Sequence, residues 1–346
     1  MLEILMSVLS DVSRQPRRLN LTGVQVGLVT ALVLALGFGA MIAITFAMQN
    51  EMVARDRDNQ MAGVSQAITA ALDQAGRFAL AQAETTARRP SVARALGAGN
   101  RAELTDLAGG TFAYLKTQGV PIFGFHSVDM KYLLRLHLPD SFGDDITKIR
   151  PMVLAANKNH RSQVGLEIGI AGTYVRGVAV INDGDRFVGT VEAGLNLEPI
   201  LEQVKALTNA DIAVVLSQSL ADLPPRRPND KAAGEAFGDL ILFASTDTPL
   251  FAGLLRDGAI RLARTREVGD RPMEGASAAI VVQPLIDFSG RMIGNLVAAK
   301  RFSYHGAELR RTRTELIAAA LIGAILAFVA FSVLARMITA RRETSA

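Results

Sequence analysis

Two uncharged apolar runs bracket a long segment of mixed composition. The runs cover residues 21–48 and 316–335, and neither contains a charged side chain. Roughly 20 consecutive apolar residues cross a bilayer as a helix, whereas the apolar core of a signal peptide is only about 7–15 residues long. We therefore predict two transmembrane helices, the first of which is an uncleaved anchor.

Arginines flank both runs and predict the topology. They are Arg14, Arg17 and Arg18 before the first run, Arg310, Arg311 and Arg313 before the second, and Arg336, Arg341 and Arg342 after it. Short flanks rich in arginine stay cytoplasmic, and long translocated segments largely escape this rule. We expect residues 1–20 and 336–346 to be cytoplasmic and the segment between the runs to lie outside the inner membrane. These arginines either contact anionic lipid, at about 1 kcal/mol each, or only set the topology.

A narrow apolar stripe follows the first run. Residues 49–89 contain no proline, and Met61, Val64, Ile68 and Leu72 recur at spacings of three and four. This spacing predicts an amphipathic helix of the coiled-coil type. The stripe packs on its own domain or also pairs with a second chain; we predict the second case, a homodimer.

The apolar period changes to that of strands after residue 120. The stretches VPIFGFHSV, KYLLRLHL, QVGLEIGI, TYVRGVAVI and RFVGTVEAGL read as strands, and ADIAVVLS, ILFAST, RLARTREV, SAAIVVQPLID and GRMIGNLVAAKRF follow further along. Helices that are segregated from antiparallel strands indicate an α+β fold. We predict two antiparallel-sheet modules, one over 90–210 and one over 211–314.

Composition excludes several classes of function. The chain has no cysteine, so it has no disulfide and no thiolate site. Its net charge is only +4, and 4 Tyr without any Trp give no basic stripe with interleaved aromatic residues, as nucleic-acid binding would require.

No catalytic or metal site is expected either. The histidines His126, His137, His160 and His305 do not have the spacing of metal ligands. Asp140, Asp144 and Asp145 lack the regular alternation of a calcium loop, and we expect Asp144 or Asp145 to cap the following helix. The chain is predicted to be no enzyme and to hold no cofactor.

A group of polar residues is the candidate ligand site. Arg135 and His137 alternate with leucines and so project to one face of a strand. Arg150, Glu167 and Arg176 lie in neighbouring elements. Arginines that face a cleft suit a carboxylate, which the guanidinium binds with two hydrogen bonds. The alternative is an internal salt bridge between Glu167 and Arg176 or Arg135 that only holds the module together.

The same stretch carries a family resemblance. Residues 125–183 contain an aromatic-His strand, Leu-Arg-Leu-His, Pro-Asp-Ser-Phe-Gly-Asp-Asp, Arg-Pro-Met, and Gly-Leu-Glu-Ile-Gly followed by Arg-Gly-Val. This block resembles the first module of the double Cache sensor domains of bacterial chemoreceptors and sensor kinases. The resemblance implies two stacked PAS-like modules, the first far from the membrane and the second near it.

The short tail 336–346 leaves two hypotheses of function open, because such receptors continue into a long cytoplasmic output region. In the first, the chain binds anionic lipid and organises or bends the membrane; its layout resembles that of the MamY family of magnetosome membrane proteins, for which liposome binding and tubulation are implied. In the second, it is a ligand-binding sensor subunit that signals through a partner protein. The first hypothesis places the protein in the bacterial inner membrane or in an organelle membrane derived from that membrane.

Overall fold

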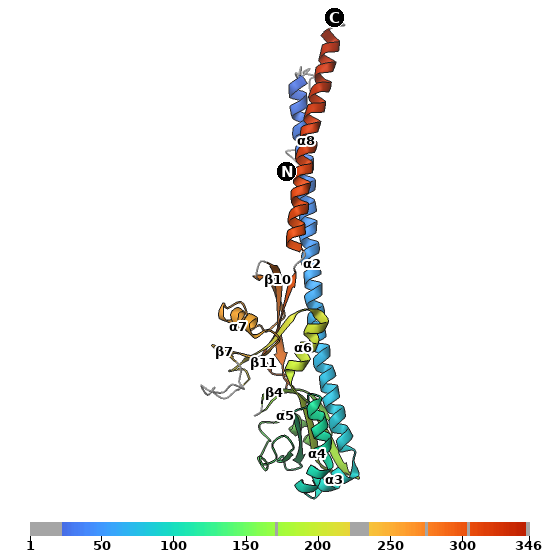
Figure 1. Ribbon diagram of the computed structural model, residues 1–346, viewed down its shortest axis with the longest axis vertical. Coiled ribbons are helices and arrows are strands. Elements are labelled where there is room, and N and C mark those ends of the chain that lie inside the picture. The colour runs from blue at the N-terminus through green and yellow to red at the C-terminus, as the bar shows by residue number, and fades with distance from the viewer. Residues whose placement is uncertain (1–22, 170–171, 222–234, 274–275, 303–304, 344–346) are drawn as a thin grey trace, which may run out of the picture. The chain divides into compact units, whose positions relative to one another are not determined.

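The computed structural model describes residues 23–169, 172–221, 235–273, 276–302 and 305–343. The chain divides into two units, one made of residues 1–55 and 304–346 and the other of residues 56–303. The second unit contains two antiparallel sheets with helices on both faces (Figure 1). This arrangement confirms the predicted α+β class with a long N-terminal helix.

Among the residues that the structure describes, two helices are long and apolar enough to cross a membrane. The first is α2 (Gly23–Ala87), and the second is α8 (His305–Glu343), whose apolar window is Thr314–Val333. The first apolar run and the amphipathic stretch after it therefore form one helix, which ends just before Pro90 because proline disfavours a helical conformation of the residue that precedes it.

The first module follows α2. Its helices are α3 (Pro90–Gly97), α4 (Arg101–Thr117) and α5 (Pro151–Asn159), and its strands are β1 (Ile122–Ser127), β2 (Tyr132–Arg135), β3 (Gln163–Gly169), β4 (Gly172–Asp183) and β5 (Arg186–Leu195). The strands form a five-stranded sheet in the order β2-β1-β5-β4-β3.

The second module has the same plan. Its helices are α6 (Leu197–Thr208) and α7 (Thr248–Arg256), and its strands are β6 (Asp211–Ser217), β7 (Glu235–Phe237), β8 (Leu240–Ser245), β9 (Glu267–Met273), β10 (Ala276–Ile286) and β11 (Met292–Phe302). The strands form a six-stranded sheet in the order β7-β8-β6-β11-β10-β9. The predicted strand over RLARTREV begins only at Glu267.

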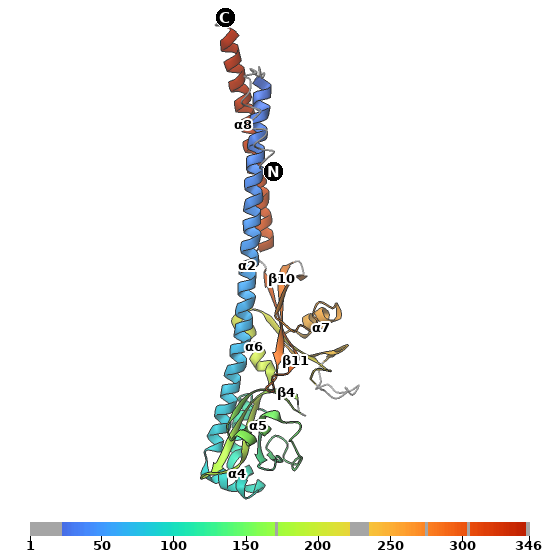
Figure 2. The same ribbon diagram turned by 180° about the vertical axis from the view of Figure 1, so that it is seen from behind.

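The outer part of α2 lies along both sheets (Figures 1 and 2). Ala79, Ala83 and Ala87 enter the core of the first module, where α3 and α4 also pack. The helix approaches β4 very closely, because a Cβ placed on Gly177 would lie only 2.2 Å from the backbone nitrogen of Leu80. Small residues at this crossing therefore fix the helix on the sheet.

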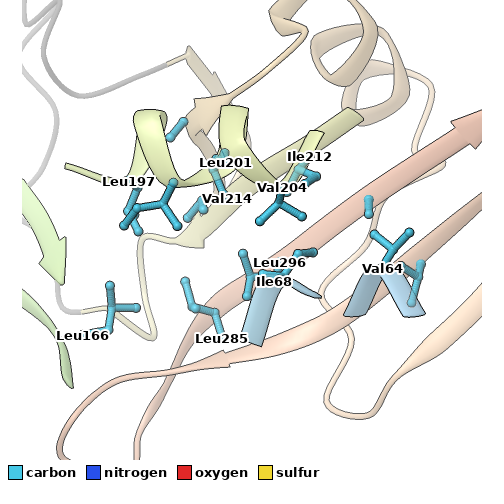
Figure 3. Close-up of a cluster of buried hydrophobic side chains, with 14 of the residues drawn as sticks. Val64, Ile68, Leu166, Leu197, Leu201, Val204, Ile212, Val214, Leu285 and Leu296 are labelled. Carbon is cyan, nitrogen blue, oxygen red and sulfur yellow. The ribbon is translucent and has the colours of Figure 1, made fainter. Parts of the chain in front are cut away.

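The apolar stripe of α2 is buried in its own chain. Met61, Val64 and Ile68 are at most 2% exposed and pack with α6, β6, β10 and β11, and Leu72 lies against the same cluster. Figure 3 shows Ile68 beside Leu296, with Leu201 and Val204 of α6 across from them. This corrects the expectation of a dimer seam at these residues. A stripe that α6 and the six-stranded sheet already cover is not available to a second chain.

The helix-capping expectation is also wrong. Helix α5 begins at Pro151, and its N-cap residue is Arg150, whose side chain makes no capping hydrogen bond. Asp145 instead accepts a hydrogen bond from the backbone of Thr147 within the preceding loop. Asp144 pairs with an arginine of the candidate site, as described below.

Candidate ligand-binding site

A cavity of about 600 Å³ lies in the first module beside β2 and the loop that follows it. Four of the five candidate ligand-site residues lie along it, namely Arg135, His137, Arg150 and Arg176. The other lining residues are Ile122, Tyr132, Leu138, Asp140, Ser141, Phe142, Asp144, Ile146, Ile149 and Glu192. The cavity thus combines a charged floor with apolar side chains from residues 138–149.

The carboxylate of Glu192 is the centre of the charged floor. Glu192 is fully buried on β5 and accepts hydrogen bonds from the Tyr132 hydroxyl at 2.5 Å and from Arg176 at 2.8 Å. The guanidinium of Arg150 donates to both of its oxygens. A buried carboxylate is tolerated only when it is paired and hydrogen-bonded in this way.

Glu167 extends the network behind the cavity. Its carboxylate accepts from Nε of Arg150 at 2.7 Å and from the backbone N–H of Met152 at 2.8 Å, and Nε of Arg176 lies 3.8 Å away. Arg150 and Arg176 are each shared between two glutamates. The internal salt bridge expected as the alternative is therefore present, and it forms the floor of the cavity.

Burial and the two arginines change the pKa of Glu192 in opposite directions. Burial alone would raise the pKa of Glu192, but the charges of Arg150 and Arg176 hold this pKa well below its ordinary value. Burial and the neighbouring charge of Glu192 raise the pKa of Tyr132 well above its ordinary value. Glu192 is therefore ionised and the Tyr132 hydroxyl is protonated, so the hydroxyl donates to the carboxylate.

The rim of the cavity carries a second ion pair. Arg135 donates two hydrogen bonds to Asp144, at 2.6 and 2.8 Å, and a third to the carbonyl oxygen of Ser141 at 2.8 Å. Its guanidinium lies 3.7 Å above the ring of Tyr132. The hydrogen bond from Arg135 lowers the pKa of Asp144. The Asp144 side chain is 38% exposed, so this pair is open to solutes, unlike the pairs of the floor.

Two histidines lie beside these pairs. His137 follows the end of β2, and its Nδ1 is 3.2 Å from the carbonyl oxygen of Phe123. His126 on β1 is fully buried, with Nδ1 3.0 Å from the Thr190 hydroxyl and Nε2 3.5 Å from Glu192. Burial lowers the pKa of both histidines. Within the described residues, Nε2 of His126 has no hydrogen-bond partner.

Sequence reasoning missed Glu192, Tyr132 and Asp144 as members of this site. A signal for Glu192 was present, because it is the one acidic residue of β5 and stands among apolar residues and glycines. No such signal marks Tyr132, since aromatic residues are common in strands. Across the described ranges, no three His, Asp or Glu side chains are grouped so that they could hold a metal ion.

The predicted lipid-contacting arginines fall into two groups. Arg14, Arg17 and Arg18 lie outside the described residues. Arg310, Arg311, Arg313, Arg336, Arg341 and Arg342 belong to α8. Among these, Arg311 is exposed and pairs with Glu315 at 2.9 Å. Contact of these residues with lipid stays a prediction.

Comparison with known proteins identifies the fold family. The family model described as the double sensory domain of two-component sensor kinases (dCache_3) matches residues 56–305. The chain belongs to this family. It therefore carries a double Cache sensor domain, as the resemblance in residues 125–183 predicted. Its two apolar helices flank this domain, a layout that suits an inner-membrane protein with an extracytoplasmic domain.

Several solved sensor domains are similar in outline. The periplasmic domain of LuxQ from Vibrio cholerae has a TM-score of 0.41 and 12% identity, and the match covers 70% of this chain and 99% of that domain. The sensory domain of the Campylobacter jejuni chemoreceptor Tlp3 with isoleucine bound has a TM-score of 0.44 and 11% identity. That match covers 74% of this chain and 94% of the Tlp3 domain. The sensor domain of the V. cholerae histidine kinase DctB has a TM-score of 0.43 and 11% identity, and the match covers 73% of this chain and 99% of that domain. No curated protein sequence matches the chain.

Proposed function

We propose that this chain is a membrane-anchored sensor whose first module binds a small solute in the cavity above Tyr132 and Glu192. One observation carries the proposal: a partly exposed ion pair, Arg135 with Asp144, lies at the rim of a cavity whose floor is a buried network of ion pairs. A floor held in this way is preorganised, so a ligand does not have to order it.

The charges favour a ligand that carries a carboxylate, an amine or both. Arg150 and Arg176 already have glutamate partners in the floor. A ligand carboxylate therefore binds Arg135 by taking the place of Asp144, and a ligand amine binds the carboxylates of Asp144 and Asp140 at the rim. The apolar side chains of Leu138, Phe142 and Ile149 surround the remainder of the molecule.

A thermal-shift screen tests this proposal. Full-length protein in detergent micelles is heated with a library of small carboxylates, amines and amino acids. Binding to the folded state at 100 times the Kd raises the unfolding free energy by about 2.7 kcal/mol. At least one compound should raise Tm in the wild type and in the surface control Arg186→Ala, but not in Arg135→Ala. A shift that persists in Arg135→Ala would place the ligand elsewhere.

Topology and signalling follow from the same proposal. Both termini are cytoplasmic and the double Cache domain is extracytoplasmic. The membrane helices, the amphipathic stretch and the two modules have the residue boundaries predicted from the sequence. Cache sensor domains of kinases and chemoreceptors act on signalling proteins, and we propose a partner protein that receives the signal from α2 or α8. A reporter that is active only in the cytoplasm should give signal when fused after Ala346 and none when inserted near Asp222.

Membrane organisation is the second candidate function. It is supported by the arginines that flank both apolar helices, which would attract anionic lipid of the inner membrane or of an organelle membrane such as that of the magnetosome. A homodimer would need a surface other than the buried stripe of Met61, Val64 and Ile68. Full-length protein should then bind and tubulate anionic liposomes, less so at high salt, because exposed charges are screened. Liposomes that stay round at every protein density would rule this function out.

A further inference from the structure

The turn between β10 and β11 has a fixed shape. Its residue Asp287 is buried and accepts hydrogen bonds from the backbone N–H groups of Ser289 at 2.9 Å and Arg291 at 3.0 Å. The side chains of Ser289 and Arg291 donate to the same carboxylate, at 2.6 and 3.1 Å. Four hydrogen bonds to one carboxylate make residues 287–291 a rigid protrusion of the second module.

Phe288 at the tip of this protrusion docks on the first module. Its backbone N–H donates to the carbonyl oxygen of Leu166 on β3 at 2.7 Å. Its ring crosses Gly165, where an added Cβ would lie 3.2 Å from Cδ2 of the ring. The ring also packs on the apolar cluster that contains Tyr132 and Ile146. Both of these residues also line the cavity, so one apolar cluster is shared by the cavity wall and the Phe288 turn.

Strand β3 provides a second link between the cavity and the second module. Successive side chains of a strand point to opposite faces. Leu166 enters the apolar cluster that includes Leu285 of β10 (Figure 3). The next residue, Glu167, holds Arg150 and the backbone of Met152 in the cavity floor. A shift of the floor therefore moves the strand on which Phe288 is docked.

We propose that the Phe288 turn, residues 287–291, couples occupancy of the cavity to the second module. This rests on the proposed function and names how the same site is regulated. A group that fills the cavity restrains the motion of the floor and of β3, which carries Glu167, and β3 then holds the Phe288 turn more firmly. Because coupling is reciprocal, any shift of β10 and β11 that loosens the ring also weakens binding in the cavity.

A tethered group tests the coupling without a known ligand. The chain has no cysteine, so Leu138→Cys, at an exposed position of the cavity wall, offers one thiol. Reaction with 2-aminoethyl methanethiosulfonate places an aminoethyl group in the cavity. Amide hydrogen exchange is then followed in the full chain in detergent micelles. Exchange of residues 286–292 should slow by about fivefold or more, the lower end of typical allosteric coupling. The same label at Leu207→Cys, an exposed position of α6, should not slow it.

Two variants of Phe288 decide whether the turn carries the effect. Phe288→Ala removes the ring, so labelling should slow exchange in residues 132–150 and no longer in residues 286–292. Phe288→Leu keeps an apolar contact and should retain the effect. Three results overturn the proposal: slowing confined to 132–150 in the wild-type background, equal slowing with Phe288→Ala, or no change anywhere on labelling. The tethered group takes the place of the ligand. This experiment can therefore be interpreted even if the thermal-shift screen finds no ligand.

Discussion

Loss of Arg176 should destabilise the fold far more than loss of a surface arginine. In Arg176→Ala, the buried carboxylate of Glu192 loses its 2.8 Å partner and Glu167 loses a neighbouring charge. Removing one partner of a buried pair costs about 3–5 kcal/mol. We expect about 3 kcal/mol, the lower value, because Arg150 still donates to Glu192. For a domain of this size, 1 kcal/mol corresponds to about 2–4 °C, so Tm should fall by about 6–12 °C.

The assay is thermal unfolding of full-length protein in detergent micelles, followed by circular dichroism. The matched control is Arg186→Ala, which breaks an exposed pair with Asp183 and should change stability by about 0.5 kcal/mol or less. Adding Glu192→Gln to Arg176→Ala should restore part of the lost stability, because an amide does not need a cationic partner. The reasoning is refuted if Arg176→Ala lowers Tm no more than Arg186→Ala does.

Three further predictions concern other parts of the domain. Acid should destabilise the protein as pH falls through about 6.5. Burial lowers the pKa of His126, so below this pH the unfolded chain binds a proton that the folded chain does not. The unfolding free energy should fall by up to about 1.4 kcal/mol per pH unit, and by less in His126→Gln. Gly177→Ala should cost about 1–3 kcal/mol or more in denaturant unfolding, because its Cβ would overlap the backbone of Leu80; an unchanged midpoint would contradict the close crossing. Ile68→Asp should unfold the domain, because Ile68 is 1% exposed; a folded variant that changes only its oligomeric state in sedimentation would restore the dimer seam.

Part of the cavity lining was predictable, because some of its residues are polar interruptions of apolar stretches. Arg135 and His137 stand out among leucines, and the structure places both on the cavity although only Arg135 belongs to β2. The position of Glu192 was harder to predict. Strand β5 is buried on both faces, so alternation does not tell which side a residue faces.

The function of the α2 stripe could not be read from its spacing. A helix that packs on two sheets and a helix that pairs with its copy both need apolar residues three and four apart. Only the structure shows that Met61, Val64 and Ile68 are covered by their own chain. In the same way, Asp144 and Asp145 precede a helix as caps do, but the partner of Asp144 is Arg135, a residue nine positions earlier that the loop brings beside it.

Methyl NMR of the isoleucines tests the central claim most directly. With a compound from the thermal-shift screen, the signals of Ile122, Ile146 and Ile149, which line the cavity, should shift in proportion to occupancy. The same titration of Arg135→Ala should leave them unchanged. Shifts confined to isoleucines of the second module, such as Ile241 and Ile280, would show that the ligand binds elsewhere and would contradict the assignment of this cavity as the sensory site.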